Sequence, residues 1–140
     1  MKLYVESFVK SVVTAAPEAS LAAVARQMQE RNVGAVAIVD GSKPVGIITD
    51  RDLALELGAR GTSPHTPVVR VMTTPIQTVS GEEGVFAATQ RMREVNVRRL
   101  PVVDEGGSLV GIVTLDDLLR MLSRELSNLV EGIKPEFVVK

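Results

Sequence analysis

The chain contains an internal repeat, and this repeat limits the possible folds more than any other feature of the sequence. The segment VGIITDRDL at residues 45–53 returns 65 positions later as VGIVTLDDL at residues 110–118. Upstream the shift is 64 positions, and there Asn32-Val33 matches Asn96-Val97. The shift changes at an expected turn, where related units tolerate insertions. The chain therefore consists of two homologous units.

Both units begin with the same predicted elements, a short strand followed by a helix. The strands are β-branched stretches at 12–14 and 76–78. Helix-start signals follow: Pro17-Glu18-Ala19-Ser20 in the first unit, and in the second Ser80-Gly81-Glu82-Glu83, which has the spacing of a capping box. Apolar residues at helical spacing then predict the helices themselves: Leu21, Val24, Ala25 and Met28, and in the copy Val85, Ala88 and Met92.

Two further strands and a second helix complete each unit, which gives the order β-α-β-β-α. The strands are expected at 35–39 and 45–48, and in the copy at 100–103 and 109–113. A unit of about 60 residues buries too little surface to be stable alone, so the two units should pack together with pseudo-twofold symmetry. The expected fold class is α/β (α+β). Its predicted boundaries are 5–60 for the first unit, 61–68 for a linker, 69–125 for the second unit, and 126–140 for a helix end and tail.

The last helix is predicted to be longer than its copy in the first unit, which Gly58 and Gly61 bring to an end. Its aliphatic residues recur every three or four positions, at Leu115, Leu118, Leu119, Leu122, Leu126, Leu129 and Val130. The additional leucines either cap the same core or form the surface of a homodimer. The sequence favours neither alternative.

Composition argues against several classes of function. The chain has no cysteine, and its single histidine, His65, lies in the predicted linker, so we expect neither an enzyme nor a metal site. A net charge of −1 and a shortage of aromatic residues argue against nucleic acid as a partner. No apolar run reaches the ~20 residues of a membrane helix. Because Glu6 and Lys10 interrupt the start, where a signal peptide is apolar, the expected location is cytoplasmic.

The motif Thr-x-x-Asp stands at the start of the second helix in both units, as Thr49/Asp52 and Thr114/Asp117. Threonine followed three residues later by an acid is close to a capping box, and the acid also suits a helix N-terminus. A single copy would favour helix capping. The repeated frame Gly-hydrophobic-hydrophobic-Thr-x-x-Asp favours ligand binding, so both interpretations stay open.

These repeated segments resemble a tandem pair of cystathionine-β-synthase-type (CBS) domains, the arrangement called a Bateman module. The resemblance rests on GIITDRDL at 46–53, RLPVVD at 99–104 and VMTTP at 71–75, and it extends from Val9 to Leu122. It implies a ligand that contains adenosine: AMP, ADP, ATP or S-adenosylmethionine. It implies no cofactor, although ATP would bring Mg²⁺ with it.

The resemblance also implies roles for individual residues. Asp52 and Asp117 would accept hydrogen bonds from the ribose hydroxyls, as an ionised carboxylate can. Thr49 and Thr114 would meet the ribose or phosphate edge beside a helix N-terminus. The adenine would lie against Val13, Thr14, Val33, Ala35 and Val36 in the first unit, and against Gln77, Thr78, Val97, Leu100 and Pro101 in the second. Which unit supplies which half of a pocket stays open.

The two units differ in their basic residues. Arg51 has no basic counterpart in the second motif, and Arg98-Arg99 replace Gly34-Ala35. The planar fork of arginine suits a phosphate, so Arg51, Arg98 and Arg99 are the predicted phosphate contacts. Arg91 and Arg93 are expected on a solvated helix face. We therefore expect two sites of unequal affinity.

Taken together, these features predict a regulatory module. An adenine nucleotide would bind in the cleft between the units, and a homodimer would pass the change on to an effector protein. One alternative is a structural oligomerisation module with vestigial sites. The other is a nucleic-acid-binding module that uses the basic cluster at 91–99.

Overall fold

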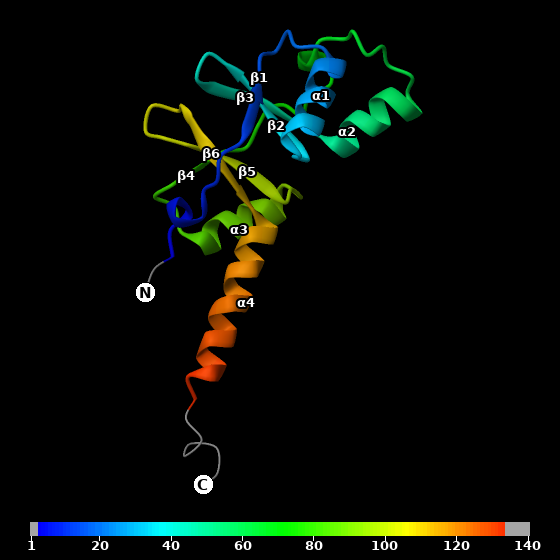
Figure 1. Cartoon of the computed structure of the whole chain (residues 1–140). Helices are drawn as coiled ribbons and strands as arrows, with labels where there is room; N and C mark the ends of the chain where they lie inside the picture. Colours follow the sequence, from blue (N-terminus) through cyan, green and yellow to red (C-terminus); the bar gives the residue numbers. More distant parts are fainter. Residues whose placement is uncertain (1–2, 134–140) are drawn as a thin grey trace.

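The computed structural model describes residues 3–133, which form two similar units, each with a three-stranded sheet and two helices (Figure 1). In both sheets the middle strand runs parallel to the first strand and antiparallel to the third. The first unit contains β1 (Val13–Ala15), α1 (Leu21–Arg31), β2 (Ala35–Asp40), β3 (Lys43–Thr49) and α2 (Asp50–Ala54). The second contains β4 (Val79–Ser80), α3 (Val85–Glu94), β5 (Arg99–Val103), β6 (Leu109–Thr114) and α4 (Leu115–Glu131). The predicted α+β class and element order are confirmed.

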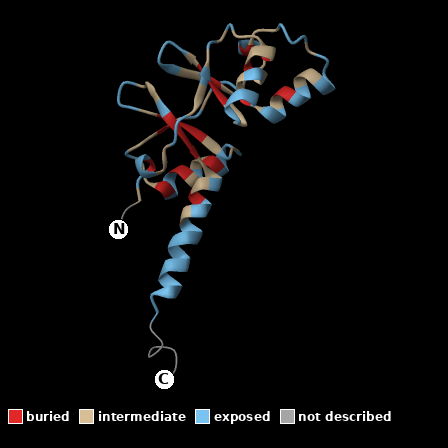
Figure 2. Ribbon diagram, in the orientation of Figure 1, coloured by how far each residue is buried: buried red, intermediate tan, exposed pale blue. Residues whose placement is uncertain are grey.

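Each unit has its own aliphatic core, which lies between its sheet and its helices (Figure 2). The apolar faces of α1 and α3 supply matching core residues, as their spacing predicts: Leu21, Val24 and Met28, and in the second unit Val85, Ala88 and Met92. Just after each helix an asparagine turns the chain in the left-handed region, with φ of 53° at Asn32 and 56° at Asn96. Asparagine tolerates this conformation better than most residues, which explains why it recurs at these two positions.

The segments that precede the two units exchange places. Val5 belongs to the core of the second unit, and its amide donates to the Glu83 carbonyl at 2.9 Å. Val68 belongs to the core of the first unit, and its amide donates to the Ala19 carbonyl at 2.7 Å. Each unit is therefore completed by chain that comes before the other unit. The predicted boundaries follow chain order, whereas the packing crosses them.

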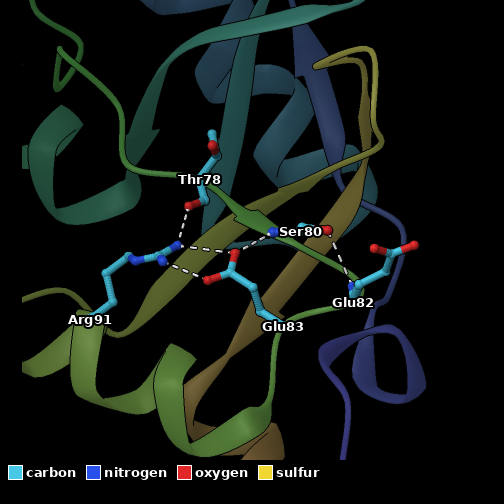
Figure 3. Close-up of polar contacts among 5 residues, drawn as sticks. All are labelled: Thr78, Ser80, Glu82, Glu83 and Arg91. Atoms are coloured by element: carbon cyan, nitrogen blue, oxygen red, sulfur yellow. Dashed lines mark hydrogen bonds and ion pairs between the residues drawn. The ribbon is translucent and has the colours of Figure 1, made fainter.

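Two local predictions for the second unit are wrong. The strand expected at 76–78 lies at Val79–Ser80, and α3 begins at Val85 rather than directly after Ser80. Ser80 and Glu83 instead close a turn ahead of the helix: the Ser80 amide donates to Glu83 Oε2 at 2.7 Å, and Ser80 Oγ accepts from the Glu82 amide at 3.2 Å (Figure 3). The Val85 amide donates to the Leu3 carbonyl at 2.8 Å, so the crossing segment satisfies a donor at the start of α3, where no side chain caps the helix.

Helix α4 extends well beyond the body of its unit, and most of it is exposed (Figures 1 and 2). Leu118 is buried, whereas the exposed fraction is 38% at Leu122, 63% at Leu126 and 70% at Leu129. The leucines after the second turn therefore do not cap the core of their own chain. None of the helices within residues 3–133 is long and apolar enough to cross a membrane. The predicted tail from residue 134 onward lies outside the described residues.

Candidate functional site

A pocket of about 230 Å³ lies where the two units meet. The first unit contributes the segment that leads into β1 and the left-handed turn that connects α1 to β2. The second unit contributes the start of β5 and the end of β6. The lining residues are Lys10, Ser11, Val12, Val13, Asn32, Val33, Gly34, Ala35, Arg99, Ile112 and Thr114. The pocket thus joins the apolar residues predicted for adenine in one unit to the Thr-x-x-Asp motif of the other.

Several predicted site residues are brought together here. Val13, Val33 and Ala35 line the pocket from the first unit, and Arg99 and Thr114 line it from the second. Thr14 lines an adjoining hollow of about 400 Å³, which shares Ser11, Val12, Val13 and Val33 with the pocket. Residues of both units thus line one pocket, and the half of a ligand that each unit would hold stays a prediction.

The two Thr-x-x-Asp motifs differ in geometry. Thr49 and Asp52 form a complete capping box: the Asp52 amide donates to Thr49 Oγ1 at 3.2 Å, and the Thr49 amide donates to Asp52 Oδ2 at 2.9 Å. In the second motif only the first half is present, with the Asp117 amide donating to Thr114 Oγ1 at 3.1 Å. The capping interpretation therefore holds in full for the first motif alone. The Asp117 carboxylate accepts no hydrogen bond from the Thr114 amide.

The Asp117 carboxylate instead lies between two cations at the edge of the pocket. Lys10 Nζ is 2.9 Å from Oδ2, and Arg120 Nη1 donates to Oδ1 at 3.0 Å. The Lys10 ammonium is the main cause that holds the pKa of Asp117 below its ordinary value, against a smaller effect of burial. Despite the short ionic contact, Oδ2 is buried and accepts no hydrogen bond of acceptable geometry.

The three predicted phosphate contacts have different surroundings. Arg99 lines the pocket, and its Nη1 donates to the Gly34 carbonyl of the other unit at 3.4 Å. Arg98 turns away from the pocket and pairs with Asp116 at 2.6 Å, which holds the pKa of that carboxyl below its ordinary value. Arg51 is exposed on α2, at the position that Asp116 occupies in the repeat. Arg99 alone of the three reaches this pocket.

The remaining predicted adenine contacts lie outside this pocket. Val36 and Leu100 point into the two cores, so the prediction that their side chains line a surface pocket is wrong. Pro101 is also buried, Gln77 is exposed, and Val97 packs against the second core. Gln77, Val97 and Pro101, together with Thr49 and Asp52, stay a prediction for a second site.

Arg91 is held in place rather than solvated, contrary to our expectation. Its Nη1 donates to the Thr78 carbonyl at 2.7 Å, and its Nη2 pairs with Glu83 at 2.5 Å (Figure 3). This clamp ties α3 to the turn that follows β4. Arg93 is exposed, as expected. The basic cluster at 91–99 therefore does not form a single free surface.

Sequence reasoning missed Lys10 as a site residue. Its backbone pairs with Ile112 of β6, with the Lys10 amide donating to the Ile112 carbonyl at 3.0 Å, and this pairing holds the side chain at the pocket. The equivalent pairing in the first unit joins Thr73 to Ile47, so the repeat does not preserve the basic residue. A residue that is not repeated gives no signal in a search for repeats.

Two homologous units that exchange their leading segments and share a pocket define a tandem-domain module. The chain belongs to the CBS-domain family, whose model matches residues 5–59 and 68–124, one stretch in each unit. The resemblance predicted from the motifs is confirmed.

Individual relatives agree with this assignment. An uncharacterized protein of Methanopyrus kandleri, MK0525, is 35% identical over 127 residues, and the match covers 89% of this chain and 65% of that protein. The chain thus spans just under two thirds of that relative's length. The CBS domain pair of protein MJ0100, solved with 5′-methylthioadenosine and S-adenosyl-L-methionine, is 29% identical with a TM-score of 0.80, covering 89% of this chain and 99% of that one. PAE2072 from Pyrobaculum aerophilum, complexed with AMP, is 26% identical with a TM-score of 0.79, covering 90% and 99%.

Proposed function

We propose that this chain is a regulatory module that binds an adenosine-containing ligand in the pocket between its two units. The observation that carries the proposal is that residues of both units line one pocket. Apolar residues beside β1 face Arg99 and Thr114 of the other unit across one cavity, with Asp117 at its edge. Solved CBS pairs of similar fold hold AMP or S-adenosyl-L-methionine, which supports the ligand class.

The chemistry of the pocket suits a nucleoside. Val13, Val33 and Ala35 offer an apolar surface for a flat base. Asp117, an acceptor when ionised, would accept hydrogen bonds from ribose hydroxyls, and Arg99 would contact a phosphate. A ligand held by both units would restrict how the units move relative to one another. A partner protein would detect that restriction. The role that we propose is therefore regulation through ligand binding.

A second copy of the chain is the partner proposed for α4. Leu119, Leu122, Leu126 and Leu129 alternate at spacings of three and four, which is the pattern of a helix that packs along another helix. All four side chains are exposed within the single chain. Pairing two such helices would cover these leucines and link two ligand pockets in one assembly. An effector protein would then act on the homodimer.

Thermal melts of the protein with AMP, ADP, ATP, S-adenosylmethionine and an RNA oligomer test the proposal. A ligand at roughly 100 times its dissociation constant should stabilise the fold by about 2.7 kcal/mol. We expect at least one adenosine ligand to raise the melting temperature and the RNA to have no effect. Stabilisation by none of them would favour a structural oligomerisation module with vestigial sites, and stabilisation by RNA alone would favour a nucleic-acid-binding module.

A further inference from the structure

Lys10 contacts the pocket, the Asp117 carboxylate and the backbone of the second unit. Its side chain lines the cavity, its ammonium contacts Asp117, and its backbone pairs with Ile112 of the second unit. Because the segment before β1 crosses to the second unit, this lysine faces a carboxylate that lies 107 residues further along the chain.

The charged residues that line the pocket are cations, and the Asp117 carboxylate lies beside one of them, at the pocket edge. Of its eleven lining residues, Lys10 and Arg99 are charged, and both are cations. One N–H group of Arg99 donates to the Gly34 carbonyl. The Lys10 side chain is 55% exposed, so it can change its position more freely. A pocket with two cations on its walls favours a ligand that carries negative charge.

The ion pair between Lys10 and Asp117 covers the oxygen that a ribose would need. Asp117 Oδ2 is buried under the ammonium and lacks a hydrogen bond of acceptable geometry. A hydroxyl donor directed at Oδ2 would supply the hydrogen bond that this oxygen lacks, at the cost of the ionic contact with Lys10. Ribose hydroxyls are such donors, but Lys10 must move before they reach Oδ2.

We infer that Lys10 selects anionic adenosine ligands at this site by changing partners: it pairs with Asp117 in the free protein and with the ligand phosphate in the complex. The inference rests on the proposed function and specifies its ligand class. A ligand with a phosphate replaces the ionic contact that Lys10 loses. A neutral adenosine ligand displaces Lys10 from Asp117 and offers it no anion in return, so it binds more weakly.

Calorimetric titration with AMP and with 5′-methylthioadenosine tests this inference. The second compound keeps the adenosine but has a neutral thioether in place of the phosphate. For the wild type we expect tighter binding of AMP. Lys10→Met keeps the length of the side chain without its charge, and it should weaken AMP by roughly ten- to a hundredfold, as expected for a charged hydrogen bond. The same variant should bind 5′-methylthioadenosine as well as the wild type does, or more tightly.

Two further variants separate selection from a structural effect. Lys43→Met removes the same charge at an exposed position outside the pocket lining and should leave both affinities unchanged. Lys10→Arg keeps a cation and should retain the preference for AMP. Equal weakening of both ligands in Lys10→Met, or no change in either, would overturn the inference while the proposed function stands. A wild type that binds neither compound nor any other adenosine ligand would overturn both.

Discussion

At the scale of single residues, two repeated glycines make room for the segments that cross between the units. A Cβ at Gly111 would collide with the backbone carbonyl of Lys10 and with Val9. A Cβ at Gly46 would collide with the side chain of Met72. The glycine that opens each Gly-hydrophobic-hydrophobic-Thr motif is therefore explained by close packing of the crossing chain, and Gly111 lies directly behind the pocket wall that Lys10 forms.

Alanine at these two glycines should have unequal effects, because a backbone segment yields less readily than a flexible thioether. We expect Gly111→Ala to destabilise the fold by about 1–3 kcal/mol through overpacking, and Gly46→Ala to cost less. Gly58→Ala is the control, since nothing lies within 4 Å of its added carbon. Urea unfolding of the three variants measures the differences. Equal losses for Gly46→Ala and Gly111→Ala would contradict this account of the crossing segments.

At the scale of elements, the repeated pattern predicts most helices and strands because their apolar faces are set locally. The pattern does not predict the positions of β4 and of the start of α3. At the start of α3 the Val85 amide donates to the Leu3 carbonyl, which lies more than 80 residues away in the chain. The residues of the candidate site also fall into two groups, those that the sequence predicts and one that it does not. Thr114, Asp117 and the apolar wall follow from repeated motifs, whereas Lys10 reaches the pocket only because its segment crosses to the other unit.

Helix α4 is the element that carries the prediction on assembly. Replacing Leu122 and Leu126 with glutamate places charges in the exposed leucine seam, where burial against another helix would cost them their hydration. The variant should be a monomer by light scattering under conditions where the wild type is a dimer. Its fold should persist, because both side chains lie outside the two cores. A wild type that is monomeric at micromolar concentration would contradict the proposed dimer.

At the scale of the whole molecule, the crossing segments connect the pocket to both cores. Residues 3–10 extend from the core of the second unit to the mouth of the pocket, and the hairpins of the two units touch through Ser42 and Ser108, whose hydroxyl oxygens are 3.0 Å apart. The proposed ligand at the junction would therefore act on both units together. The two units differ at the site: the Asp117 carboxylate pairs with Lys10, whereas the Asp52 carboxylate closes the capping box of α2.

The most direct measurement is a calorimetric titration with AMP of the wild type, Asp117→Asn and Asp52→Asn. We predict fewer than two equivalent strong sites per chain in the wild type. Asp117→Asn should weaken the strong site by roughly ten- to a hundredfold, because it removes the charge that accepts the ribose hydroxyls. Asp52→Asn should leave that site intact, because the Asp52 carboxylate is engaged in the capping box of α2. Two indistinguishable sites, or equal losses in the two variants, would contradict the account.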